Sequence, residues 1–181
     1  MTEAARRALL FAVLGVVSGA AAATAFELAD PESFFYVFLF YLAPGLVFGV
    51  ALGPTLWRCR VLRAAGAGFY AIAAALAHGC AMFTAIVLDD RLQRVLNGHI
   101  PVLIVSGVIA GALGASLLGG VTRLLAPVPR WPVLAAPGAL LGALLPVAVE
   151  GDTPGFFVFY VLWQAGYAAT LALILPRIET V

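Results

Sequence analysis

Charged residues are scarce in this chain, and lysine is absent altogether. Asp, Glu, Lys and Arg make up only 10% of the 181 residues, and all ten basic residues are arginine. Soluble domains carry about 25% charged residues, so this chain has too few polar groups to cover a folded surface in water. The arginines also form no basic patch suited to nucleic acid, and we expect no nucleic-acid partner.

Signatures of enzymes, cofactors and disulfides are also missing. The chain has two cysteines, Cys59 beside arginines and Cys80 within an apolar run, which do not suggest a disulfide framework. It contains no H-E-x-x-H, G-x-S-x-G or phosphate-binding loop, and no carboxylate within any long apolar run. Asp89 and Asp90 with His99 match no specific metal-binding spacing. We therefore expect no catalytic activity, no cofactor and no metal site.

Long apolar runs dominate the sequence. Hydrophobic residues make up 64% of the chain and the mean hydropathy is +1.07. Several runs are long enough to cross about 30 Å of hydrocarbon as a helix. The sequence predicts an all-α fold, a polytopic membrane bundle of six helices that forms a single domain over residues 1–181, with the lipid bilayer around it. The expected spans are residues 8–26, 34–54, 64–88, 100–122, 131–149 and 156–176.

Two segments allow a second interpretation. Ala23-Thr24-Ala25, at the end of the first run, resembles a signal-peptidase site, but the run is long enough to span, and we favour a retained helix. Between Asp89 and His99, apolar residues fall on one helical face. This piece is either a short surface helix or an extension of the third span.

Arginine gathers in four stretches of the chain, and acidic residues gather in the others. The arginine-rich stretches hold eight arginines against Glu3 and Glu179, whereas the other loops hold seven acids against Arg91 and Arg94. Because arginine-rich loops stay in the cytoplasm, we expect both termini to be cytoplasmic and the bundle to lie in a bacterial inner membrane. The seven external acids predict a solvated rim or a mouth that concentrates cations. The arginine-rich stretches are residues 1–7, 54–63, 123–130 and 177–181.

A proline–glycine pattern occurs twice within the apolar runs. Pro44-Gly45 opens one copy, which ends at Gly53-Pro54, and Pro137-Gly138 opens the other, which ends at Pro146. Proline lacks an N–H and clashes with the preceding turn, so each copy should kink or break its helix. Broken helices at matching places in two halves point to a transport site near the middle of the membrane.

The same spacing indicates an internal repeat. Pro44 and Pro137 are 93 residues apart, and Gly15 and Gly107 are 92 apart, which aligns spans one to three with spans four to six. An odd number of spans per half makes such a repeat inverted. A rival alignment, at a spacing of 122, pairs the first hairpin with the last. Chance matches are easy in a sequence this rich in Ala, Gly, Leu and Val, and both alternatives stay open.

Glycines recur at four-residue spacing along several spans. Lipid provides no hydrophobic drive for helices to associate, so close backbone approach at small residues holds membrane bundles together. We expect tight packing within one subunit, and spare small faces could form a homo-oligomer or dock a partner membrane subunit. The expected packing glycines are Gly15, Gly19, Gly49, Gly53, Gly107, Gly111 and Gly142.

Strongly polar side chains are rare inside the spans, and His78 and Gln164 stand out. On the expected boundaries they lie at about the same depth, where polar groups usually face the bundle interior. They predict either a polar site between spans three and six or two structural hydrogen-bonding groups. Aromatic residues that could line the same cavity are Tyr41, Tyr160, Trp163 and Tyr167.

These features together predict a small channel or transporter for a small solute or ion, with its site near the two proline–glycine kinks. The alternative is a non-catalytic docking or assembly subunit of a larger membrane complex. The expected pathway residues are His78, Gln164, Pro44, Gly45, Pro137, Gly138, Tyr41, Tyr160, Trp163 and Tyr167.

Overall fold

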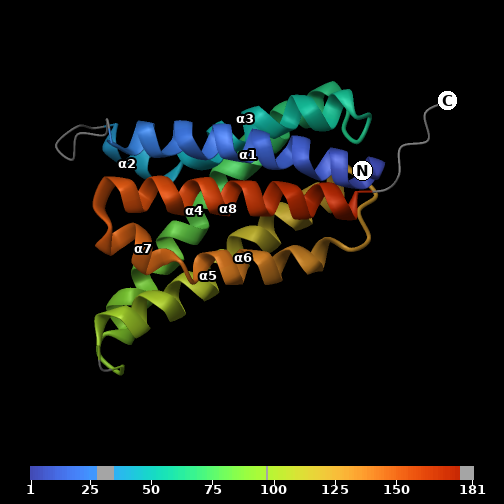
Figure 1. The fold of residues 1–181 in the computed structure, drawn as a ribbon. Helices are drawn as coiled ribbons and strands as arrows, with labels where there is room; N and C mark the ends of the chain where they lie inside the picture. Colours follow the sequence, from blue (N-terminus) through green and yellow to red (C-terminus); the bar gives the residue numbers. More distant parts are fainter. Residues whose placement is uncertain (28–34, 97, 176–181) are drawn as a thin grey trace.

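The computed structural model describes residues 1–27, 35–96 and 98–175, which are helical apart from turns and short loops, with no strand among them (Figure 1). Five helices or helical stretches are long and apolar enough to cross a membrane. The elements are α1 (Glu3–Glu27), α2 (Tyr36–Tyr41), α3 (Ala43–Arg58), α4 (Ala64–Leu92), α5 (His99–Leu125), the 3-10 helix η1 (Trp131–Leu134), α6 (Ala135–Gly142), α7 (Leu145–Glu150) and α8 (Asp152–Ile174).

The second apolar run is interrupted, as the first proline–glycine copy predicts. It forms the short helix α2 and the longer α3, which meet at Leu42. Pro44 lies two residues beyond the junction and offers no N–H to the carbonyl of Phe40, so the hydrogen-bond ladder cannot run through. Pro54, by contrast, is accommodated inside α3 without a break.

The fifth run is interrupted as well. It consists of η1, α6 and α7, and the break between the last two falls at Ala143 and Leu144. Pro146 follows the break at the start of α7 and offers no N–H to the carbonyl of Gly142. The third run is continuous to Leu92, which makes the segment after Asp89 an extension of this helix, one of the two alternatives expected.

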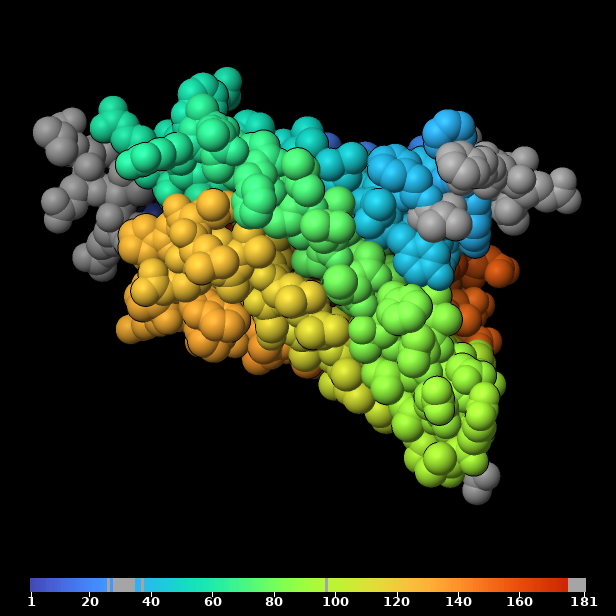
Figure 2. Space-filling view, turned by 180° about the vertical axis from the view of Figure 1, so that it is seen from behind, coloured from blue at the N-terminus to red at the C-terminus, as the bar shows by residue number. Residues whose placement is uncertain are grey.

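The helical segments form a closed ring. Each packs on the next along the chain, from α1 through α3, α4, α5 and α6 to α8, and α8 returns to pack on α1 along most of its length. In Figure 1, α1 and α8 run side by side, while α4 and α5 cross behind them at an angle. Seen from behind, the α4–α5 pair runs diagonally across the molecule, and its turn projects beyond the neighbouring helices (Figure 2).

Apolar side chains fill the core of the bundle and also cover its outer faces. Phe11, Phe48 and Tyr70 are fully buried in the main core, which draws on most of the ring. Large apolar side chains such as Phe83 and Leu140, by contrast, are more than half exposed on the outer faces, as in proteins whose surface contacts lipid.

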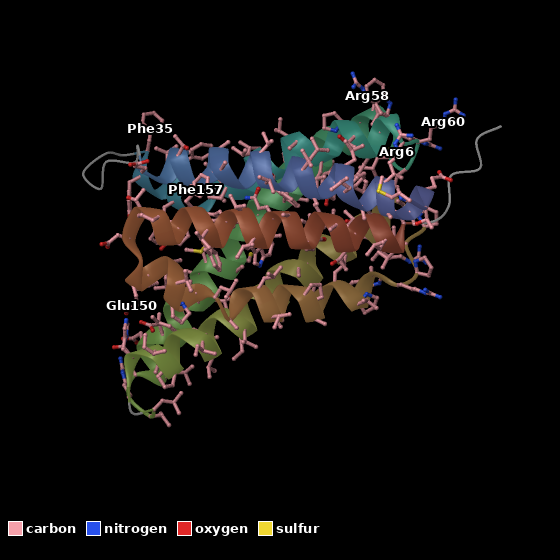
Figure 3. All side chains as sticks on the ribbon, in the orientation of Figure 1. Arg6, Phe35, Arg58, Arg60, Glu150 and Phe157 are labelled. Atoms are coloured by element: carbon pink, nitrogen blue, oxygen red, sulfur yellow. The ribbon has the colours of Figure 1, made fainter. Side chains whose placement is uncertain are left out.

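Charge is segregated to the two ends of the bundle. Arg6, Arg58 and Arg60 lie at one end and Glu150 lies at the other (Figure 3). At the arginine end, the guanidinium of Arg7 donates to the carbonyl oxygen of Leu175 at 3.1 Å, which ties the start of α1 to the end of α8. The molecule therefore has the two polar ends and the apolar middle of a membrane protein.

Candidate functional site

A cavity of about 50 Å³ lies inside the ring. Small side chains of α4 and α5 form one wall, and the opposite wall comes from α8 with contributions from α3, α6 and α7. A void of this size has room for a few water molecules. The lining residues are Gly45, Phe48, Ala74, Ala77, His78, Ala81, Met82, Ala85, Gly107, Ala110, Gly111, Gly114, Leu118, Gly142, Leu145, Phe159, Tyr160, Trp163 and Gln164.

His78 reaches from α4 to the break between α2 and α3. Its Nδ1 lies 2.8 Å from the carbonyl oxygen of Tyr41, the last residue of α2. A carbonyl oxygen only accepts hydrogen bonds, so Nδ1 carries the proton and donates it. In the neutral ring the other nitrogen, Nε2, is then an acceptor. The histidine thus holds the end of α2 with one nitrogen and keeps a lone pair on the other.

Gln164 reaches the same break from α8. Its Nε2 donates to the carbonyl oxygen of Pro44 at 3.2 Å, and its exposed fraction is 1%. Because that carbonyl can only accept, this contact fixes which end of the amide faces α3. The carbonyls on both sides of the break are therefore held by polar side chains from helices distant in the sequence.

Several buried polar atoms have no hydrogen-bond partner among the described residues. Two of them belong to residues that line the cavity, the Oε1 of Gln164 and the hydroxyl of Tyr160. The buried hydroxyls of Tyr70 and Tyr167, by contrast, lie close to each other and to Thr122. Buried polar atoms in folded proteins are nearly always paired with protein or water. Neighbouring atoms cover the Oε1 of Gln164 and the hydroxyl of Tyr160, so these two atoms lie behind the wall of the cavity and do not open onto it.

Aromatic rings enclose the polar groups. The ring of Tyr160 lies 5.8 Å from that of His78 between centroids. Trp163 stacks on Tyr167 at 5.7 Å with an interplanar angle of 11°, and Phe48 meets Tyr167 edge-on at 5.7 Å. These contacts fix the side chains of α8 against α3 and α4, which limits how far the cavity can change shape.

The ten expected pathway residues separate into two groups. Five of them, Gly45, His78, Tyr160, Trp163 and Gln164, line the cavity. Tyr41 and Pro44 contribute the carbonyl oxygens that the polar side chains bind, and Tyr167 lies behind Trp163. Pro137 and Gly138 are not among the lining residues, and Gly138 packs on Gly111 and Ala115 of α5.

The sequence did not single out the α4–α5 wall. Ala74, Ala77 and Ala81 recur at helical spacing along α4 and face the cavity together with Gly114 of α5. A stripe of small residues on two consecutive helices is the signal that could have located this wall, although the same stripe is also typical of close packing. Tyr70, which is fully buried, was also missed.

The seven expected packing glycines all lie at contacts between helices of this chain. A Cβ added to Gly15 or Gly19 would meet the backbone of α8, and one added to Gly49 or Gly53 would meet the backbone of α4. Gly107 and Gly111 meet α6 in the same way, and Gly142 meets Gly107. These small faces are therefore occupied within the bundle.

Short-range pairs occupy the acidic end. His99 Nε2 lies 3.3 Å from Glu150 Oε1, and Arg94 pairs with Asp90 at 3.0 Å one turn away. Gln93 donates to the carboxylate of Asp89 at 2.7 Å. Among the described residues no group of three or more His, Cys, Asp or Glu side chains is arranged to hold a metal ion.

Comparisons with known protein families, with curated proteins and with solved structures find no match for this chain.

Proposed function

We propose that this protein is a small membrane channel or transporter for a small solute, without catalytic activity, and that the solute passes through the central cavity. The proposal rests on one observation: a void inside the ring lies beside an interrupted helix whose flanking carbonyls are bound by His78 and Gln164. Helix interruptions in membrane proteins are tolerated where they line a cavity, and transporters commonly place their sites there.

The proposed topology has six crossings. Residues 36–58, taken through the break at Leu42, extend over roughly 34 Å if helical throughout, which suffices to cross the hydrocarbon core. The arginine-rich end is assigned to the cytoplasm of a bacterial inner membrane by the positive-inside rule. Labelling single cysteines at Arg58→Cys and Asp89→Cys tests this, because the two should react from opposite sides. Reaction of both from one side would contradict the topology.

An inverted repeat remains part of the proposal. In this repeat α1 corresponds to α5, α3 corresponds to α6 and α7, and α4 corresponds to α8. The contact of α1 with α8 then corresponds to that of α5 with α4, and the contact of α3 with α4 corresponds to that of α6 and α7 with α8. The docking alternative, by contrast, depended on spare glycine faces. Since the seven glycines are occupied inside the bundle, no observation on the described residues favours it.

A direct test is reconstitution of the purified chain in liposomes. Flux of a small solute should exceed that of protein-free vesicles and should fall in His78→Ala and Gln164→Ala. Thr84→Val is a matched control, because the Thr84 hydroxyl bonds within its own helix to the carbonyl of Cys80 and does not line the cavity. Equal flux in all three variants would contradict the proposed path.

Thiol reactivity tests the path without knowledge of the solute. Ala81 lines the cavity, whereas its neighbour Cys80 is exposed on the outer surface, so the two positions are matched in depth. In a chain with Cys59→Ser, hydrogen peroxide, which is no larger than the proposed solutes, should oxidise the double variant Cys80→Ser/Ala81→Cys about tenfold faster than the native Cys80, because only a hydrated thiol ionises readily. Equal rates would show that water does not reach the cavity.

A further inference from the structure

The polar groups inside the cavity carry information about which solutes it admits. Among the described residues, no Asp, Glu, Lys or Arg lines the void. A bare ion there would lose its hydration without a countercharge, which costs several kcal/mol or more. The wall therefore differs in kind from the two charged ends of the bundle.

The hydrogen-bonding groups on that wall are mainly acceptors. His78 uses its Nδ1–H on the carbonyl of Tyr41, which leaves Nε2 as an acceptor in the neutral ring. Gln164 uses its amide nitrogen on the carbonyl of Pro44, which leaves Oε1 as an acceptor with no partner. Both side chains therefore donate to the interrupted helix. Neighbouring atoms cover the Oε1 of Gln164 and the hydroxyl of Tyr160, whereas the Nε2 of His78 is not among the covered atoms and is the acceptor left to the cavity.

The cavity is long and narrow. Lining residues run from Ala74 to Ala85 on α4 and from Gly107 to Leu118 on α5. Eleven steps along a helix correspond to roughly 16 Å, about half the thickness of the hydrocarbon core. A volume of about 50 Å³ spread over that length has the width of one small molecule.

We infer that the cavity selects small uncharged molecules that carry N–H or O–H donors, in the size range of water and urea. This inference rests on the proposed function and names its substrate class. An anion needs several donors, which the wall lacks. An alkali cation needs about six oxygen ligands or a countercharge, and the wall supplies neither. A small neutral molecule needs neither, and its N–H or O–H groups can donate to the Nε2 of His78.

The experiment uses proteoliposomes that contain the full chain. Stopped-flow light scattering measures water and urea entry, and a potential-sensitive dye measures charge movement with K⁺ and Cl⁻ gradients. We expect water and urea to enter several times faster than into protein-free vesicles, with no change in membrane potential. His78→Leu should lower urea permeability about tenfold, since it removes the acceptor left to the cavity. Thr84→Val should leave permeability unchanged, because its hydroxyl lies outside the cavity.

Each outcome decides between the inference and the function on which it rests. Potential-driven flux of K⁺ or Cl⁻ would overturn the neutral selectivity and leave the channel or transporter intact. Absence of flux for water, urea and both ions would overturn both. Wild-type urea permeability in a folded His78→Leu would overturn the role of this acceptor. Should that variant fail to fold, Ala81→Leu narrows the cavity without removing a hydrogen bond, and should slow urea more than water; equal slowing of both would count against the size limit.

Discussion

The two interrupted segments share a sequence pattern, but the backbone carbonyls beside the two breaks have different partners. At the break between α2 and α3, long polar side chains from α4 and α8 bind the flanking carbonyls at 2.8 and 3.2 Å. At the break between α6 and α7, the backbone closes on itself through turn-type bonds, such as that from Leu144 to the carbonyl of Leu141 at 3.1 Å. The carbonyl of Gly142 then lies directly against Gly107 of α5.

This difference concerns how the neighbouring helices approach each break. A side chain as long as glutamine holds its own backbone away from the carbonyl it binds, which leaves room beside the break. Glycine against glycine removes that room, because the two helices approach until their backbones touch. Contacts of this kind, in which a Cα–H group meets a carbonyl oxygen, stabilise membrane helix pairs weakly but repeatedly. The cavity borders both breaks, through Gly45 at the first and through Gly142 and Leu145 at the second, and Gly45 also packs closely on the backbone of Ala74. The breaks therefore differ in the polar side chains that reach the first one.

The largest expected effect is at the contact between α5 and α6. Gly111→Ala places a methyl group against the carbonyl oxygen of Gly138 and 3.0 Å from the Cα of Gly142. Backbone cannot move aside as a side chain can, so we expect a loss of about 1–3 kcal/mol in the free energy of unfolding. Thermal unfolding in detergent, followed by circular dichroism, measures it.

Gly68→Ala is the matched control for this substitution, since a Cβ built there meets no atom within 4 Å. Alanine also has the better helix propensity, by about 1 kcal/mol, so the control should be neutral or stabilising. A Gly111→Ala protein as stable as Gly68→Ala would mean that α5 and α6 are not in close contact.

The break between α2 and α3 should be less sensitive to substitution. Gln164→Leu leaves the carbonyl of Pro44 without its side-chain donor, and hydrogen bonds within membrane bundles contribute about 0.6 kcal/mol on average and up to about 1.7. Ser18→Ala is the comparison, because its hydroxyl is equally buried but bonds to Gly15 within α1. Unfolding in the same detergent should rank Gln164→Leu as the more destabilising of the two. The reverse order would argue against a stabilising hydrogen bond between Gln164 of α8 and Pro44 of α3.

A double-mutant cycle sharpens the comparison. Pro44→Ala returns an N–H to the chain, so the helix can continue towards α2 and needs its side-chain support less. We expect Gln164→Leu to cost about 0.5 kcal/mol less in the Pro44→Ala background, a coupling within the range seen for residues in contact. Pro146→Ala in place of Pro44→Ala should show weaker coupling, because the hydrogen bond of Gln164 goes to the first break, at the carbonyl of Pro44. Coupling of equal size for both prolines would contradict the distinction between the breaks.

Sequence reasoning located the elements of the fold better than their continuity. Runs of apolar residues predicted the helical stretches, since length and hydropathy are local properties. Pro44 and Pro54 show the limit. Both prolines lie in one apolar run, yet only Pro44 accompanies a break. Which proline interrupts its helix depends on whether neighbouring segments can satisfy the freed carbonyls, and that is a tertiary property.

The candidate site shows the same limit. His78 and Gln164 were recognisable because strongly polar residues are rare within apolar runs. Their shared target, the carbonyls of Tyr41 and Pro44, was not recognisable, because backbone atoms carry no mark in a sequence. Pro137 and Gly138 had the same local pattern as Pro44 and Gly45, but α5 presents glycines where α4 presents a histidine.

The smallest expected effect concerns the acidic end of the bundle, where His99 of α5 lies 3.3 Å from Glu150 of α7. Both side chains are about half exposed, with fractions of 50% and 52%, so water and salt screen the pair. Glu150→Gln should therefore lower the free energy of unfolding by less than about 0.5 kcal/mol, and the difference should vanish in high salt. A loss larger than that of Gly111→Ala would mean that charge, rather than close glycine contact, holds α7 to α5, and the contrast between the two breaks would then have a different cause.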